Sequence, residues 1–159
     1  MTLQLEGRLA TRGDTPLGDR CAVDRTMRLI GNRTAMLLLR EAFHGVTRFD
    51  SLHKRVGVSE AVAAQRLREL VAAVVMEKRP YREPGKRTRY EYALTEAGHA
   101  LLPIVIALFE WGGRYAPDGH TPGSVTHTGC GEPAHVQIRC EAGHAVAEDE
   151  LAVRGSRDA

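Results

Sequence analysis

The sequence has few cysteines, few aromatic residues and no apolar run long enough to cross a membrane. Its three cysteines are an odd number spread along the chain, a pattern more typical of a reducing compartment than of a disulfide-stabilised secreted fold. The longest apolar stretch, residues 100–111, falls well short of the ~20 residues that a membrane helix needs. Residues 1–20 carry charge and no continuous apolar segment, so we expect no secretory signal. These absences predict a cytoplasmic protein with free thiols or a metal site, and no membrane partner.

The motifs of the common enzyme classes are also missing. The chain has no G-x-S-x-G nucleophile elbow, no H-E-x-x-H zinc motif, no P-loop and no dinucleotide fingerprint. We therefore expect no catalytic residues and no required cofactor. The net charge is only +2, so any affinity for nucleic acid must come from where the basic residues lie rather than from their total.

The length and composition predict one compact domain with tails. A chain of 159 residues with 43% apolar content is globular and too short for two full-sized domains. Residues 1–19 lack an apolar period and are predicted to form a flexible arm. Residues 20–115 contain the core, residues 116–129 form a linker rich in Gly, Pro, Thr and His, and residues 130–159 form a small C-terminal hairpin extension.

Three helices are predicted in the first half of the core. Apolar residues at helical spacing follow Cys21, and this first helix ends at Gly31, a favoured C-cap residue. Asn32 is placed to cap a second helix that reaches Phe43 and carries too many apolar residues for one narrow stripe. This second helix is predicted to be central to the core. A third helix covers residues 51–56, with Asp50 as its cap.

The fourth helix, over residues 59–72, has two different faces. Ser59 is its predicted N-cap. The residues expected to face the core are Val62, Leu67, Leu70 and Val74. The residues expected on the opposite face are Glu60, Ala64, Gln65 and Arg68. Small, amide-bearing and cationic side chains of this kind can enter a DNA major groove and contact base edges, although an ordinary solvated helix face has the same composition.

A hairpin with a basic tip follows this helix. Strands over residues 74–82 and 87–94 are joined by a predicted type II turn with Pro84 and Gly85 at its centre. Five arginines and lysines lie between residues 79 and 89. We expect Tyr81, Tyr90, Tyr92, Val75 and Leu94 on one face and Arg82, Arg87 and Arg89 on the other. Clustered like charges weaken a hairpin, so a bound polyanion explains them better than a solvated loop, which is the alternative.

The last helix of the core, over residues 96–115, is apolar almost all round. Thr95 is its predicted cap, and Pro103 is expected to kink it because proline has no N–H for the carbonyl of His99. A helix this apolar at the end of a small domain needs a cover, which a second copy of the chain would provide.

The order of these elements predicts the fold class. Helices, a helix-turn-helix pair and a β-hairpin with a basic tip describe a winged helix, a mainly α fold with a small antiparallel β-hairpin (α+β). In such folds the second helix of the pair enters the major groove of double-stranded DNA, and the wing contacts flanking phosphates or the minor groove.

Over residues 21–115 the sequence resembles the HxlR-type transcriptional regulators. The segments "RFDSL", "LREL" and "YEYALTEAG" occur in the order and spacing of that family, as do a Cys before the first helix and a Trp near the end of the last. The chain departs from the family pattern at Ala22, where the family has Pro, and at Val74, where it favours Gly. Glycine adopts a left-handed C-cap more easily than valine does.

The resemblance implies a homodimer that binds a specific DNA sequence, with an inverted-repeat operator. Carried over to this chain, Gln65 and Arg68 are the expected base readers, with Ser59, Glu60 and Ala64 beside them in the groove. The expected contacts to phosphate or minor groove are Arg48, Lys54, Arg82, Lys86, Arg87 and Arg89. The resemblance also implies dimerisation through the first and last helices. The residues expected there are Met27, Leu101, Ile104, Val105, Leu108, Phe109 and Trp111.

Cys21 is a candidate thiol sensor. Arg20 and Arg25 are near it, and it precedes a helix, which are conditions that favour the thiolate. Some members of the resembled family sense quinones, aldehydes or oxidants through a Cys at this place. The alternatives are a structural thiol and control by another small-molecule effector. An alternative for the whole chain is a winged-helix module that binds protein, or nucleic acid without operator specificity.

The C-terminal extension holds a candidate metal site. His127 with Cys130, and Cys140 with His144, have spacings that could supply a tetrahedral Cys2His2 zinc site on a small hairpin. His135 is a further ligand candidate. A zinc ribbon usually has two C-x2-C pairs, so the alternative is a degenerate hairpin without metal.

Overall fold

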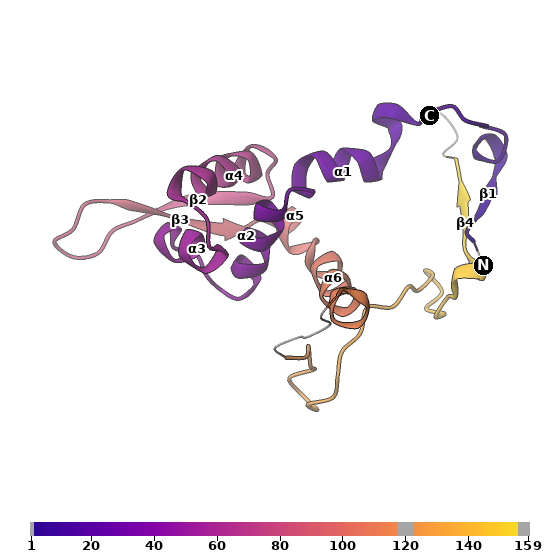
Figure 1. Cartoon of the computed structure of the whole chain (residues 1–159). Helices are drawn as coiled ribbons and strands as arrows, with labels where there is room; N and C mark the ends of the chain where they lie inside the picture. The colour runs from indigo at the N-terminus through magenta and orange to yellow at the C-terminus, as the bar shows by residue number, and fades with distance from the viewer. Residues whose placement is uncertain (1, 118–122, 156–159) are drawn as a thin grey trace. The chain divides into compact units, whose positions relative to one another are not determined.

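The computed structural model describes residues 2–117 and 123–155 (Figure 1). The described residues form two compact units: one lies within residues 19–123, and the other combines residues 1–18 with residues 124–159. In these described ranges, no helix is long and apolar enough to cross a membrane.

The larger unit is a mainly helical domain with one β-hairpin. Its helices and strands are, in chain order, α1 (Ala22–Ile30), α2 (Arg33–Phe43), α3 (Phe49–Val56), α4 (Glu60–Ala72), β2 (Met76–Tyr81), β3 (Arg89–Leu94), α5 (Glu96–His99) and α6 (Leu102–Tyr115). This order is that of a winged helix-turn-helix domain, with α3 and α4 as the helix pair and β2–β3 as the wing. The predicted fold class is confirmed.

The core lies among α2, α3, α4 and the first wing strand. The largest fully buried side chains are Leu38, Leu39, Leu52, Leu67, Leu70 and Met76. Full burial of one such side chain stabilises the fold by roughly 1.5–3 kcal/mol. In Figure 1 the wing extends from this core in one direction, while α1 and α6 lie at the opposite end of the unit. One face of α4 packs into the core through Leu67 and Leu70, and the opposite face is exposed to solvent.

Side-chain caps start three of the helices where the sequence predicts them. Asn32 Oδ1 accepts hydrogen bonds from the second and third N–H groups of α2, at 2.9 and 3.4 Å. Ser59 Oγ accepts from the third N–H of α4 at 3.4 Å, and Thr95 Oγ1 accepts from the third N–H of α5 at 3.1 Å. Helix α3 differs: Arg48 occupies the N-cap position without a side-chain bond, and Asp50 lies inside the first turn.

The wing turns where the sequence predicts, but its strands are shorter than expected. The N–H of Lys86 donates to the carbonyl of Glu83 at 3.0 Å, and Gly85 has a φ of 74°, as a type II turn requires. The strands end at Tyr81 and begin again at Arg89, so residues 82–88 form the loop.

The register of the wing corrects the predicted position of Tyr81. Pro80 pairs with Tyr90, and Tyr81 pairs with Arg89. Directly paired residues share a face of the sheet, so Tyr81 lies on the face of Arg89 and not with Tyr90 and Tyr92. The prediction was wrong here because the strands pair one residue out of step with the assumed turn.

The predicted last helix is two helices. Helix α5 ends at His99, and α6 begins at Leu102 with Pro103 as its second residue. The sequence predicted one helix with a kink at Pro103. A proline cannot donate to the carbonyl four residues earlier, and its ring disfavours helical geometry in the residue before it. Because proline is tolerated in the first turn, the chain breaks the helix and starts a new one around Pro103.

Helix α4 ends in a left-handed residue that is not glycine. Val74 has a φ of 57°, its N–H donates to the carbonyl of Val71, and the N–H of Val75 donates to the carbonyl of Leu70, each at 3.0 Å. This pair of bonds is a Schellman C-cap. The same pattern closes α3 at Gly57, where φ is 72°. A β-branched side chain is strained in this region, so Val74 stores energy that Gly57 does not.

We expect Val74→Gly to stabilise the domain. Relief of left-handed strain gains about 1–3 kcal/mol, and the greater freedom of glycine in the unfolded chain offsets about 0.4–1 kcal/mol of it. The free energy of unfolding should therefore rise by about 1 kcal/mol, as measured by urea unfolding. Gly57→Val is the matched control and should destabilise the domain. A lower unfolding free energy for Val74→Gly would contradict the strain.

The smaller unit joins the two ends of the chain. Strand β1 (Gln4–Glu6) pairs in parallel with β4 (Ala152–Arg154), and the side chains of Glu6 and Arg154 form an ion pair. Two short 3-10 helices, residues 7–9 and 148–150, flank these strands. The structure thus differs from the predicted flexible arm over residues 1–19. The partner strand lies far away in the sequence, and a local pattern cannot indicate it.

The predicted C-terminal hairpin is reduced to narrow turns. Isolated bridges pair Thr126 with Pro133 and Arg139 with Ala145. The N–H of Cys140 donates to the carbonyl of His144 at 3.0 Å, which closes the second turn. In the described part of the predicted hairpin extension, residues 130–155, the second turn thus stands where a longer hairpin was expected.

Candidate nucleic-acid interface

The outer face of α4 carries polar side chains at helical spacing. Ala63, Leu67 and Leu70 are buried against the core, whereas Gln65 and Arg68 are exposed on the other side. Residues spaced three and four apart lie on one helix face. The two predicted base readers are therefore available to a partner that lies along this helix.

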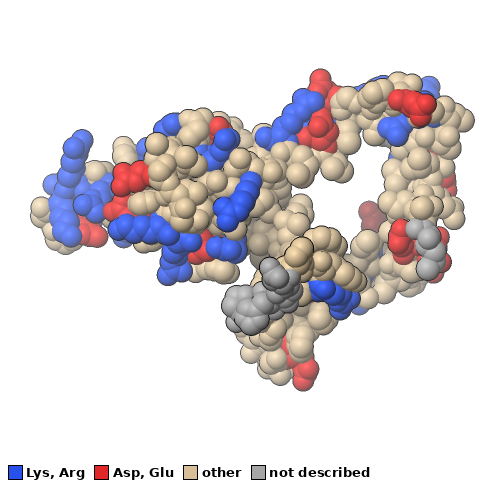
Figure 2. All heavy atoms as spheres, in the orientation of Figure 1, with Lys and Arg blue, Asp and Glu red and all other residues tan. Residues whose placement is uncertain are grey.

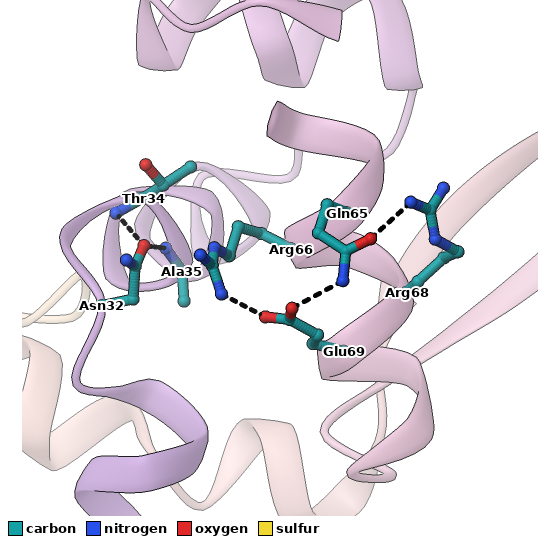
Figure 3. Close-up of polar contacts among 7 residues, drawn as sticks. All are labelled: Asn32, Thr34, Ala35, Gln65, Arg66, Arg68 and Glu69. Atoms are coloured by element: carbon teal, nitrogen blue, oxygen red, sulfur yellow. Dashed lines mark hydrogen bonds and ion pairs between the residues drawn. The ribbon is translucent and has the colours of Figure 1, made fainter. Parts of the chain in front are cut away.

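The exposed side chains of α4 are already ordered by one another (Figure 3). Arg68 Nη2 donates to Gln65 Oε1 at 2.5 Å, and Gln65 Nε2 donates to Glu69 Oε1 at 2.7 Å. Arg66 Nη1 donates to the other carboxylate oxygen of Glu69 at 2.5 Å. The hydrogen bond from Gln65, followed by that from Arg66, lowers the pKa of Glu69 below its usual range. These hydrogen bonds favour the charged form of Glu69. The sequence pattern did not indicate Glu69 as a site residue.

The other predicted groove residues lie less centrally. Ser59 uses its hydroxyl oxygen to cap α4. Glu60 points its carboxylate toward α3, where Oε1 lies 3.9 Å from His53 Nε2. Ala64 is half-buried. These three residues flank the outer face of Gln65 and Arg68.

Two valines near this helix are exposed where the sequence predicted burial. The side chains of Val62 and Val74 are 43% and 64% exposed, while Ala63 and Val75 occupy the core positions. Helix α4 ends before Val74, so the helical period no longer applies there. Val62 lies three residues before Gln65 and presents apolar surface of the kind that contacts a thymine methyl group. Its spacing to Gln65 is the sequence signal that could have identified it.

The wing concentrates positive charge at its tip. Figure 2 shows Lys and Arg side chains over the end of the hairpin. Arg82, Lys86, Arg87 and Arg89 are all exposed. Lys86 Nζ pairs with Glu83 Oε2 at 2.7 Å, and this contact lowers the pKa of Glu83. Lys54 is likewise exposed, on α3. Only part of the charge at the tip is neutralised within the wing.

Arg48 is held against the wing. Its guanidinium carbon lies 3.2 Å from the centre of the Tyr81 ring, and its Nε is 3.9 Å from Glu91 Oε2. Its Nη1 is buried and has no hydrogen-bond partner among the residues that the structure describes. The neighbouring Thr47 donates from its hydroxyl to Glu91 at 3.2 Å. These contacts fasten the start of α3 to both wing strands and place Arg48 as a wing anchor. Its side chain is still 43% exposed, so the contact with DNA phosphate stays a prediction.

The apolar residues predicted to form a dimer interface are largely exposed. Met27 of α1 and Ile104, Leu108 and Trp111 of α6 are 55%, 42%, 53% and 60% exposed. Leu101, Val105 and Phe109 are half-buried. Single exposed apolar side chains are common, but several of them on two helices are unusual for a small domain.

Cys21 lies at the N-cap of α1. Its Sγ accepts a hydrogen bond from the N–H of Asp24 at 3.5 Å, and the residue is half-buried. Arg25 is directed elsewhere, because its Nη1 donates to the carbonyl of Asp19 at 2.6 Å. The contact of this thiol with α1 is therefore made through the backbone of the first turn of the helix.

The four candidate zinc ligands are not assembled. His127 Nδ1 lies 3.2 Å from Cys130 Sγ, but the described residues contain no group of three or more side chains able to hold a metal ion. Cys140 and His144 are joined through their backbones only. A tetrahedral site needs four convergent ligands, so the predicted zinc site has no support in this geometry.

The comparisons with known proteins identify the family. A model of the HxlR-like helix-turn-helix family matches residues 29–120, more than half of the chain. The chain belongs to the HxlR-like helix-turn-helix family. It is therefore a transcriptional regulator of a DNA-binding family, not an enzyme, and the predicted family resemblance is confirmed.

Sequence relatives and solved structures agree with this assignment. An uncharacterized HTH-type transcriptional regulator of Mycobacterium tuberculosis is 38% identical over 120 residues, which cover 75% of each chain. The crystal structure of PA1607, a candidate transcription factor, has a TM-score of 0.74 and 34% identity and covers 89% of this chain and 98% of that one. The redox regulator HypR in its reduced form has a TM-score of 0.53 and 29% identity, covering 58% of this chain and 90% of its own.

Substitution of Arg48 distinguishes a wing anchor from a phosphate contact. Lysine keeps the charge but loses the planar stacking on Tyr81, so Arg48→Lys should weaken DNA binding by about tenfold, nearly as much as Arg48→Ala. The salt dependence of binding should stay unchanged in both variants. Affinity is measured by fluorescence anisotropy over a range of salt concentrations. Retained affinity for Arg48→Lys, with a shallower salt slope for Arg48→Ala, would show a phosphate contact instead.

Proposed function

We propose that this regulator is a homodimer that reads an inverted-repeat operator, with α4 in the major groove and the wing on the flanking backbone. The observation that carries this proposal is the ordered, outward-facing pair Gln65 and Arg68 on α4. A guanidinium can contact guanine and an amide can contact adenine, each through two hydrogen bonds. The exposed cations of the wing supply the phosphate contacts that position such a helix.

Dimer formation is supported by the apolar surfaces of α1 and α6. Met27, Leu108 and Trp111 are each more than half exposed, which costs free energy unless another apolar surface covers them. Both helices lie at the end of the domain away from the wing (Figure 1). Pairing there leaves both wings and both α4 helices free for DNA. A twofold dimer reads two copies of one half-site in opposite directions.

Arg68→Ala and Lys86→Ala should change DNA binding in different ways: the first should lower sequence discrimination, and the second should lower affinity for all sequences. Loss of a base reader removes about 1–3 kcal/mol of discrimination at one base pair and leaves non-specific binding nearly unchanged. Loss of a phosphate contact weakens binding to all sequences and reduces the salt slope by about 0.9 per contact. Binding to the DNA upstream of the protein's own gene and to scrambled duplexes measures both. Equal losses on both kinds of DNA for Arg68→Ala would favour the alternative of a non-specific nucleic-acid module.

We also propose that thiol chemistry at Cys21 controls DNA binding. The position of Cys21 at a helix N-terminus supports this, as does the similarity to a redox regulator, HypR. Helix α1 is one of the two helices proposed to pair in the dimer. A covalent adduct on Cys21 would therefore lie at the start of that helix and disturb the spacing of the two α4 helices.

A thiol-reactive quinone should abolish operator binding by the wild-type protein and not by Cys21→Ser. The thiolate adds to a ring carbon of the quinone and forms one C–S bond, while the electron pair of the ring C=C bond moves to a carbonyl oxygen. That oxygen takes up the proton released by the thiol, and the hydrogen of the attacked carbon shifts to the second oxygen as a proton. The product is a hydroquinone thioether, and no other reactant is needed. Cys130→Ser and Cys140→Ser are matched controls, because both thiols are exposed in the other unit. These controls should remain sensitive. Sensitivity retained by Cys21→Ser would exclude Cys21 as the sensor.

A further inference from the structure

Glu69 lies beside the hydrogen-bonded pair Gln65 and Arg68, which are proposed to read bases, and extends it into a longer row of polar side chains. In Figure 3 this row runs from Arg66 through Glu69 and Gln65 to Arg68. Gln65 lies in the middle, with its nitrogen 2.7 Å from Glu69 and its oxygen 2.5 Å from Arg68. Both ends of its amide are therefore held before any DNA is present.

The chemistry of its neighbours gives the Gln65 amide one orientation. A carboxylate only accepts hydrogen bonds and a guanidinium only donates them. The NH2 group of Gln65 must therefore face Glu69, and its oxygen must face Arg68. One N–H and one oxygen lone pair remain, which match the N7 acceptor and the N6 donor of adenine. Arg68 uses one N–H group to donate to Gln65, and its other N–H groups remain available to a guanine.

The carboxylate of Glu69 is unexpected on a helix face that is proposed to contact DNA. It repels the phosphates of every DNA sequence, so Glu69 lowers overall affinity. Arg66 holds its second oxygen at 2.5 Å, which fixes the carboxylate beside Gln65. The Arg66 side chain is only about one third exposed, so its own reach toward DNA is limited. This arrangement weakens affinity but restrains the amide, and restraint improves specificity.

We propose that Glu69 is a positioning residue for sequence reading, which acts through Gln65 and sets its preference for adenine. The inference rests on the proposed function, because it needs Gln65 to contact a base. Glu69 itself makes no base contact. Without Glu69, the Gln65 amide is free to rotate and exchange its N–H and oxygen positions. Gln65 would then bind other bases at the same position.

A double-mutant cycle tests this role at constant salt. Gln65→Ala first defines the base pair that Gln65 reads, from the binding of the full-length protein to operator duplexes changed at each position. Glu69→Ala should then lose roughly five- to tenfold of discrimination at that same base pair, while its affinity for scrambled DNA rises. Added to Gln65→Ala, it should cause no further loss of discrimination.

Two more variants separate this role from a general effect of charge or of folding. Glu96→Gln removes an exposed carboxylate that belongs to another helix, α5, and should leave discrimination unchanged. Glu69→Gln keeps an oxygen acceptor for Gln65 and should retain more discrimination than Glu69→Ala. Since Glu69 is an exposed helix position, alanine should preserve the fold, which thermal unfolding checks.

Three results would overturn the inference alone: an additive loss in the Gln65→Ala background, a loss at a different base pair, or unchanged discrimination in Glu69→Ala. In each of these cases the wild-type protein still prefers its operator. If the wild-type protein shows no sequence preference, the proposed function fails, and the inference fails with it. The two failures are thus distinguished by the wild-type measurement.

Discussion

The close packing of Gly98 against the backbone just after α4 is the constraint on which the domain depends. A Cβ at Gly98 would lie 2.2 Å from the carbonyl oxygen of Val75, so only glycine fits. Beside it, the hydroxyl of Thr95 lies 2.6 and 3.1 Å from the carbonyl oxygens of Val74 and Val75. This junction ties α4, both wing strands and α5 together. This junction therefore fixes the angle between α4 and the wing, because the backbone there has no room to move.

The wing and the outer face of α4 have different physical properties. The wing presents exposed cations whose attraction to phosphate depends on charge, and this attraction is reduced by salt. The outer face of α4 presents an ordered chain of donors and acceptors, which discriminates through geometry. Arg48 links the two, since it begins the helix pair and stacks on the wing at Tyr81. Under the proposed function, affinity and specificity thus come from separate residues held by one scaffold.

Local features could be predicted from the sequence, and long-range ones could not. The caps Asn32, Ser59 and Thr95 and the Pro-Gly turn are encoded within a few residues, and the structure has them as predicted. The role of Arg48 and the pairing of β1 with β4 depend on partners distant in sequence. In the candidate site, Gln65 and Arg68 were identified by helical spacing. Glu69 was not among the predicted site residues, because its link to Gln65 is a side-chain hydrogen bond that the helical pattern does not indicate.

Selection of DNA from a random-sequence pool by the full-length protein tests the central claim most directly. Two α4 helices related by a twofold axis predict an inverted repeat whose half-sites lie about one helical turn apart, roughly 10 base pairs centre to centre. Recovery of such a repeat would support both the reading helix and the proposed dimer. Bound DNA without a common sequence, or with a single half-site, would contradict the claim that this winged helix reads its operator as a symmetric pair.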